Sequence, residues 1–214
     1  MNNKNASPAR RRFIAGLVAV ATLPALQGCF PVVAGGAVGA AAIFADRRTS
    51  GAFVEDEGIE WRTRNRLRER FGDSVNISVT SYNRNVLLTG QVPDEAARSE
   101  AGRIAAGVDN VQGIINEIEI AGISSLTSRS NDALITSRVK ARFVDDQSFA
   151  PHHVKVVTEA GTVFLMGIVT RREADAATEV ARTTSGVQKV VRVFEYVSQE
   201  EAARLDRSVR AQNQ

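Results

Sequence analysis

The feature that most constrains the fold of this chain is an internal repeat. The segment VLLTGQV at residues 86–92 is matched 77 positions later by VFLMGIV at residues 163–169. Further along, GVDNV at residues 107–111 is matched by GVQKV at residues 186–190, a shift of two more positions. Each copy is long enough to hold a complete set of helices and strands. The repeat therefore predicts two homologous domains rather than a solenoid of short units.

Both copies show the same order of hydrophobic patterns. An amphipathic helix is followed by two alternating segments typical of a hairpin, then by an Ala-rich helix and a last strand. The expected segments lie at residues 59–71, 75–81, 86–92, from 93 onward and 114–120 in the first copy, and at 132–144, 154–158, 162–169, from 170 onward and 187–197 in the second. The order α-β-β-α-β, found twice, predicts an α+β fold with helices packed on a small mixed three-stranded sheet in each domain.

Residues 1–28 have the pattern of an export signal. Arginines precede an apolar segment that begins at Phe13, and Leu26-Gln27-Gly28 leads to Cys29, the single cysteine of the chain. This Leu-x-Gly-Cys pattern resembles the signal of bacterial lipoproteins, which implies that Cys29 is lipidated and becomes the first residue of the mature protein. A secreted protein with a stray cysteine is the alternative. The Arg10-Arg11 pair leaves twin-arginine and general secretory export both open.

The basic character of the chain comes from this signal. Residues 1–28 hold four basic side chains and no acid, so the mature chain keeps 23 basic and 24 acidic residues, a net charge of −1. A nucleic-acid partner therefore loses its main support. Residues 29–57 are interpreted as a lipidated tether and polar linker. Phe30 stands after the cysteine in place of an Asp that would retain a lipoprotein at the inner membrane, which favours a periplasm-facing position at the outer membrane.

No pattern in the sequence indicates catalysis or a bound metal. His152 and His153 are adjacent, without the spacing of a two-histidine metal motif, and we expect them to be solvated turn residues. No thiol remains once Cys29 is lipidated, and neither a nucleophile elbow nor a phosphate-binding loop is present. We therefore expect no catalytic residues, no cofactor and no enzymatic activity.

The repeat unit resembles the BON domain. The resemblance is carried by the VxLxG strand, by the GVxxV turn and, most densely, by NDALITSRVKARF, HVKVVTEAGTVFLMGIVTRREADAA and TSGVQKV in the second copy. It implies tandem BON domains at residues 58–121 and 130–198, followed by a polar C-terminal tail at residues 199–214. For outer-membrane lipoproteins of this type it also implies binding of anionic phospholipid, chiefly phosphatidylglycerol, support of membrane integrity and no catalysis.

The first helix of the second domain, expected at residues 132–144, is the candidate lipid-binding element. Ile135, Val139 and Phe143 share the face expected to join the core, and a second apolar stripe edged by cations lies around the helix from them. Such a stripe can insert between lipid headgroups while the cations meet phosphates. Carried over residue by residue, the resemblance assigns lipid contact to Leu134, Arg138, Lys140, Ala141 and Val144. Leu134 stands where the resemblance leads us to expect a tryptophan, which implies weaker binding.

Two alternatives remain open for this stripe. It could pack against the first domain or the tether. It could instead contact a protein, such as the outer-membrane protein assembly machinery, and the chain would then be an envelope interaction module. A rival surface is the arginine-rich helix of the first copy, where Trp61 stands beside Arg62 and Arg64 and could meet headgroups or nucleobases. Acidic neighbours there favour a solvated charged face.

Overall fold

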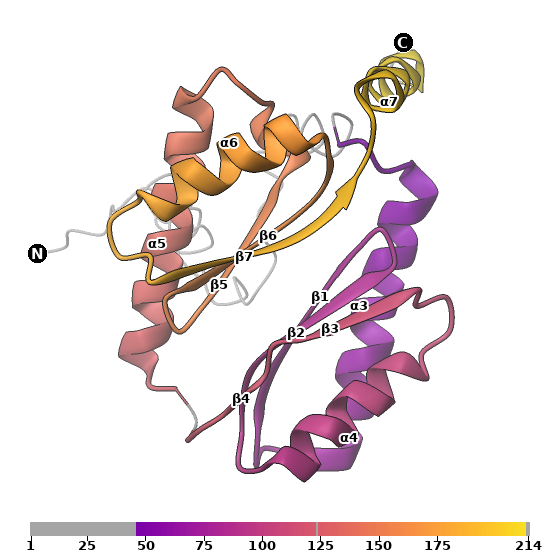
Figure 1. Cartoon of the computed structure of the whole chain (residues 1–214). Helices are drawn as coiled ribbons and strands as arrows, with labels where there is room; N and C mark the ends of the chain where they lie inside the picture. Colours follow the sequence, from indigo (N-terminus) through magenta and orange to yellow (C-terminus); the bar gives the residue numbers. More distant parts are fainter. Residues whose placement is uncertain (1–45, 123, 213–214) are drawn as a thin grey trace, which may run out of the picture. The chain divides into compact units, whose positions relative to one another are not determined.

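Figure 1 shows a computed structural model of the chain, which describes residues 46–122 and 124–212. The signal and Cys29 lie outside the described residues. The first domain contains α3 (Ser50–Phe71), β1 (Asn76–Tyr82), β2 (Asn85–Val92), α4 (Glu95–Ala106), β3 (Gly113–Asn116) and β4 (Glu119–Ile120). The second contains α5 (Leu126–Asp145), a short 3-10 helix η2 (Pro151–His153), β5 (Lys155–Glu159), β6 (Thr162–Val169), α6 (Arg171–Arg182) and β7 (Lys189–Tyr196), and α7 (Gln199–Gln212) follows.

Both sheets have the mixed topology that the sequence predicts. The hairpins β1–β2 and β5–β6 are antiparallel, and the last strand of each domain pairs in parallel with the second, as β3 does with β2 and β7 with β6. The first sheet differs in one respect, because the strand predicted at residues 114–120 is broken into β3 and β4. Ile118 lies between the two parts, where it turns into the core of the first domain. The α+β fold with two repeated domains is confirmed.

Two segments for which the sequence predicts no helix or strand, the linker and the C-terminal tail, contain helices. The linker prediction for residues 46–57 was wrong, since α3 begins at Ser50 with the Thr49 side chain accepting a hydrogen bond from the Ala52 N–H. The polar tail begins with α7, whose Ser198 cap accepts from the Glu201 N–H. Both helices have long polar faces and bury few side chains, so hydrophobic periodicity gives only a weak signal for them. For the same reason α5 begins at Leu126, before the predicted start.

The apolar side chains form three clusters. One lies between α3, α4 and the first sheet, and one between α5, α6 and the second sheet. The third lies between the two sheets and joins Tyr82 and Leu87 to Phe164, Met166 and Ile168. Both faces of β6 are therefore covered, which explains its unbroken apolar sequence. All three clusters belong to one compact unit of the chain, so we expect residues 41–214 to fold by themselves.

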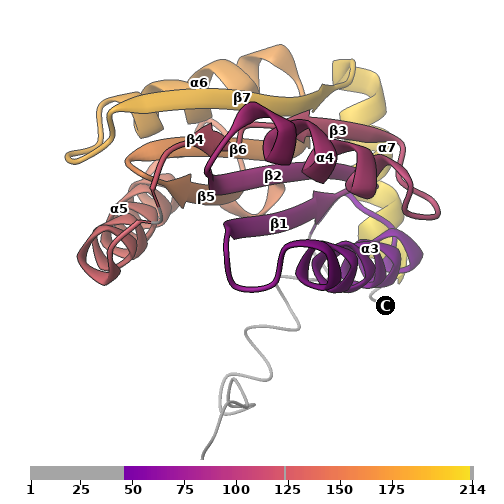
Figure 2. The ribbon, with the colours of Figure 1, turned by 90° about the horizontal axis from the view of Figure 1, so that it is seen from below.

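The first helix of each domain lies beside the first strand of its hairpin. The contacts of α3 are chiefly with β1 and those of α5 with β5, whereas α4 and α6 lie along β3 and β7. In Figure 2, α3 and α5 accordingly project on the same side of the two sheets, the lower side in this view.

A buried aspartate near the start of each first helix holds the adjacent hairpin turn. The carboxylate of Asp56 accepts hydrogen bonds from the backbone N–H groups of Asn83 and Arg84 at 2.8 and 2.7 Å, and that of Asp132 from Ala160 and Gly161 at 2.9 and 2.8 Å. All four turn residues have positive φ, as a two-residue hairpin turn requires. This pairing of helix and turn is a second, independent sign that the domains are repeats.

We expect substitution of either repeated glycine to destabilise its domain. A Cβ on Gly90, whose φ is +109°, would lie 2.0 Å from the Asn76 carbonyl oxygen, and one on Gly167 would lie 2.3 Å from that of His153. Because backbone atoms cannot move aside cheaply, Gly90→Ala and Gly167→Ala should each lower the free energy of unfolding by about 2 kcal/mol or more. Urea denaturation measures this, with Gly51→Ala as the control, because a Cβ there meets nothing closer than 3.9 Å. A normal midpoint for both variants would contradict the geometry.

Candidate membrane-binding surface

The inner face of α5 is the one that the sequence predicts. Ile135, Val139 and Phe143 are buried against the second sheet and α6. The helix starts at the N-cap Ser125, whose hydroxyl accepts a hydrogen bond from the Ser128 N–H at 3.1 Å. Thr136 donates to the Thr158 hydroxyl of β5 at 2.7 Å. These contacts fix the rotation of α5 and so determine which side chains face outward.

All five side chains predicted to contact lipid are exposed on α5. Leu134 and Val144 expose 55% and 71% of their surface, and Arg138, Lys140 and Ala141 are exposed beside them. Leu126, about two helical turns before Leu134, is 80% exposed. It was not among the predicted contacts, because the sequence pattern predicts a later start of the helix. Large apolar side chains this exposed on one helix are unusual for a surface that contacts only water. In the described part of the chain the stripe does not pack against the first domain.

The outer face of α5 carries more positive than negative charge. The helix holds four basic residues and two acidic ones, Asp132 and Asp145, and Asp132 is buried under the hairpin turn. Among the described residues no ion pair involves Arg138 or Lys140. The Arg138 guanidinium reaches only the Ser185 carbonyl oxygen, at 3.4 Å. Both cations are therefore available to an anionic surface, although residues 29–214 together are slightly acidic.

One further cation of α5 has a structural role. Arg142 donates to the Val180 carbonyl oxygen at 2.9 Å and to the hydroxyls of Thr183 and Thr184 at 3.0 and 2.9 Å. These groups lie at the C-terminal end of α6, where carbonyl oxygens lack partners within the helix. Arg142 thus ties the two helices of the second domain together.

The first residues that the structure describes are firmly held. The Arg47 guanidinium is buried and contacts Glu173 of α6 and Asp206 of α7, each at 2.8 Å, and donates to the Ile168 carbonyl oxygen at 3.0 Å. Burial alone lowers the pKa of Arg47, but these two carboxylates outweigh it and raise that pKa above its ordinary value. Arg47 therefore stays charged and fixes the chain to the second domain.

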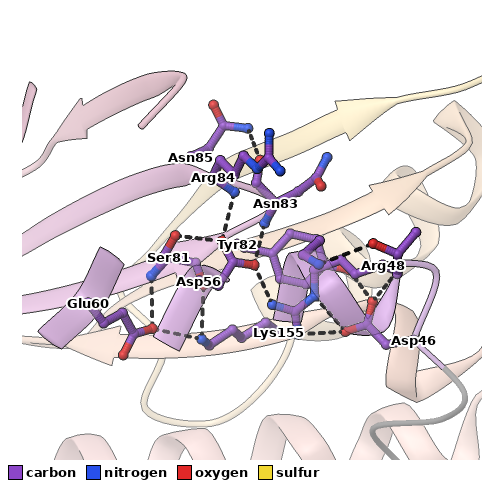
Figure 3. Close-up of polar contacts among 12 residues, drawn as sticks. Asp46, Arg48, Asp56, Glu60, Ser81, Tyr82, Asn83, Arg84, Asn85 and Lys155 are labelled. Carbon is purple, nitrogen blue, oxygen red and sulfur yellow. Dashed lines mark hydrogen bonds and ion pairs between the residues drawn. The ribbon is translucent and has the colours of Figure 1, made fainter. Parts of the chain in front are cut away.

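The neighbouring residues hold the same segment to the first domain (Figure 3). Arg48 bridges Asp46 and Asp56 at 2.8 Å each, and its guanidinium stacks 4.1 Å from the centre of the Tyr82 ring. The Tyr82 hydroxyl donates to Asp46 at 2.9 Å. Burial and the charge of Asp46 raise the pKa of Tyr82. The run Asp46-Arg47-Arg48, predicted as linker, is instead a junction between the two domains.

The prediction that both histidines are solvated was wrong for His153. Its ring is buried, with Nε2 3.5 Å from Asp206 Oδ1 and Nδ1 3.9 Å from Glu173 Oε1. His153 is the last residue of η2, and this short helix places it beside the carboxylates that bind Arg47. Sequence spacing could not show this, because Arg47 and Asp206 are distant along the chain. In the ranges that the structure describes, no group of three His, Cys, Asp or Glu side chains could hold a metal ion.

None of the helices that the structure describes is long and apolar enough to cross a bilayer. Comparison with known proteins identifies the fold. Residues 56–122 and 131–198 match the BON domain, so the chain belongs to the BON-domain family.

The chain is 37% identical over 174 residues to the outer membrane lipoprotein DolP of Haemophilus influenzae, which covers 80% of this chain and 90% of that protein. It is 38% identical to the 21 kDa hemolysin of Actinobacillus pleuropneumoniae (71% of this chain, 79% of that protein) and 31% identical to the Osmotically-inducible protein Y of Escherichia coli (65% and 72%). The relationship to DolP identifies the chain as an outer-membrane lipoprotein with two BON domains.

The ion pairs around Arg47 should make stability depend on pH. Burial raises the pKa of Glu173, but His153 and Arg47 outweigh burial and hold that pKa well below its ordinary value of 4.5. A carboxyl group whose pKa is lowered by folding stabilises the fold above its ordinary pKa, and the contribution is lost as pH falls through the lowered value.

Glu173→Gln keeps an oxygen for the α6 cap but loses the charge that Arg47 binds. We expect it to lower the free energy of unfolding at pH 7 by about 1–3 kcal/mol. The difference from the parent should shrink as pH falls below 4.5, because the unfolded parent then binds a proton on Glu173 that the folded parent does not bind until the lowered pKa is reached. Denaturant unfolding at a series of pH values measures this, with exposed Glu200→Gln as the control. A difference that is constant with pH would contradict the assignment.

Proposed function

We propose that this lipoprotein binds anionic phospholipid, such as phosphatidylglycerol, through the outer face of α5, and so supports the integrity of the outer membrane. The observation that carries the proposal is the exposure of Leu134 and Val144 beside Arg138 and Lys140, two cations that the described residues leave without an ion pair. Apolar side chains can enter the headgroup region while cations meet phosphates. The site has the features of a binding surface, and we propose no reaction for it.

The expected affinity of this face alone is modest. Fully burying one Leu or Val side chain contributes about 1.5–3 kcal/mol, and each cation near an anionic surface contributes about 1 kcal/mol. Part of this gain is offset by the loss of translational and rotational freedom on binding. A lipid anchor at Cys29, facing the periplasm, would keep the domains at the membrane and raise the effective concentration of lipid for α5. We therefore propose that the anchor retains the protein and α5 orients it.

Leu134→Glu should remove most binding of the 41–214 fragment to vesicles that contain phosphatidylglycerol. The added charge opposes insertion and repels anionic lipid, while an outward-facing side chain leaves the core, and hence the melting temperature, unchanged. Vesicle co-sedimentation measures the loss. Tyr196→Glu is the matched control, because Tyr196 is 42% exposed but lies on β7.

Vesicles of zwitterionic lipid should bind neither protein, and salt should weaken binding of the parent. If Leu134→Glu binds like the parent, α5 is not the lipid contact, and a protein partner for its outer face becomes the better explanation.

Cys29→Ser should abolish lipidation, because the chain has no other thiol. We expect the variant to accumulate as uncleaved or misplaced precursor, which fractionation of the cell envelope and labelling with a fatty-acid analogue would detect. The matched control is Gln27→Ser, which introduces the same hydroxyl two positions earlier, at the variable position of the Leu-x-Gly-Cys pattern, and leaves the cysteine in place. A Cys29→Ser protein found processed in the outer-membrane fraction would refute the lipid anchor.

A further inference from the structure

The arginine-rich helix α3 repeats the outer face of α5 in the first domain. At a constant offset of 76 positions, the N-cap Thr49 corresponds to Ser125, the buried Asp56 to Asp132, and Ile59 to Ile135. Each pair has the same role in its domain: capping the helix, holding the hairpin turn and filling the core. Positions on the two helices can therefore be compared one by one.

The cations of the two helices correspond as well. The same offset relates Arg62, Arg64 and Arg66 of α3 to Arg138, Lys140 and Arg142 of α5. The first and the last pair of these cations also make equivalent hydrogen bonds in their two domains. Arg66 donates to the Gly107 carbonyl oxygen after α4, as Arg142 does to Val180 near the end of α6. Arg62 reaches the Asp109 carbonyl oxygen at 3.5 Å, as Arg138 reaches Ser185.

The outer face of α3 carries a large aromatic side chain. Trp61 exposes 65% of its surface, and Val54, two helical turns earlier on the same side, exposes 71%. In the sequence of α3, Trp61 lies between Gly58 and Arg62, which correspond to Leu134 and Arg138 of α5. It also lies one helical turn before Arg64. Tryptophan favours the membrane–water interface, because its ring is apolar and its N–H can remain hydrated.

The two helices lie on the same side of the two sheets. Lys155 of β5 contacts Glu60 of α3 at 3.3 Å and the Ser81 carbonyl oxygen of β1 at 3.2 Å, so the edges of the two sheets lie side by side. The helices beside those edges, α3 and α5, project on one side of the sheets (Figure 2).

We propose that the outer face of α3, with Trp61 as its inserted side chain, is a second contact with the same anionic phospholipid membrane. The inference rests on the proposed function of α5 and adds a site in the other domain. Charge favours it less strongly than at α5, since α3 holds five acidic and five basic residues and Glu55 and Glu60 pair with Arg62 and Arg64. The contact should therefore depend mainly on insertion of Trp61 and respond less to salt.

The chain provides its own probe, because Trp61 is its single tryptophan. The experiment titrates the 41–214 fragment with phosphatidylglycerol vesicles whose acyl chains carry bromine, which quenches tryptophan at short range. We expect quenching and a blue shift of Trp61 emission with these vesicles, and neither with brominated zwitterionic vesicles.

Trp61→Ser should weaken co-sedimentation with unbrominated vesicles by roughly fivefold or more, because the variant loses the apolar surface that the indole ring buries on insertion. The matched control, Tyr196→Ser, removes an exposed aromatic side chain from β7 and should bind like the parent.

The outcomes separate this inference from the function on which it rests. If the parent binds vesicles and Leu134→Glu does not, but Trp61 emission is unchanged or Trp61→Ser binds like the parent, the second contact is refuted and the role of α5 stands. If the parent fails to bind phosphatidylglycerol vesicles, both are refuted. Quenching together with weakened binding of Trp61→Ser supports the two-helix contact.

Discussion

Tyr82 and Leu87 of the first sheet pack against Phe164, Met166 and Ile168 of the second, and the rest of the structure depends on this contact. A single BON unit has helices on one face of its sheet only, which would leave the other face of each sheet open to water. By placing these two faces together, the chain buries both and joins its domains in one compact unit. The same arrangement puts the first helices of the two domains on one side, where both can face a membrane.

Polar contacts complete the junction around this apolar centre. Arg47 is held by α6 and α7, whereas Arg48 and Asp46 are held by α3 and the β1–β2 turn. Three consecutive residues, the first that the structure describes, thus cross from one domain to the other. Loss of either carboxylate would leave the charge of buried Arg47 only partly compensated, because the other carboxylate would still pair with it. The N-terminal edge of the described residues is therefore fixed to both domains.

The repeat and the apolar patterns were enough to predict the element order and the inner face of α5. Ile135, Val139 and Phe143 occupy the core because their spacing leaves no other consistent rotation of the helix. The sequence could not show the junction at residues 46–48, since its partners Glu173 and Asp206 are more than a hundred positions away. Taken locally, Asp-Arg-Arg before a Thr is equally typical of a solvated linker. The sequence could not show the break at Ile118 either, because the break depends on how Ile118 packs in the core of the first domain.

The outer faces of α3 and α5 have diverged more than their inner faces. Both keep the three cations at equivalent positions, but α5 has an excess of positive charge and aliphatic side chains, whereas α3 has balanced charge and the tryptophan. A core position is constrained by its neighbours in the fold, and the equivalent positions 59 and 135 are accordingly both isoleucine. An outer position is constrained by fewer contacts within the fold, although Arg66 and Arg142 still bind carbonyl oxygens at the ends of α4 and α6. The contacts of Arg66 and Arg142 within the fold account for one of the three retained cations. The different apolar groups beside the other two are what we expect if one anionic surface meets both helices but each enters it differently, α5 through charge and aliphatic side chains and α3 through one aromatic ring.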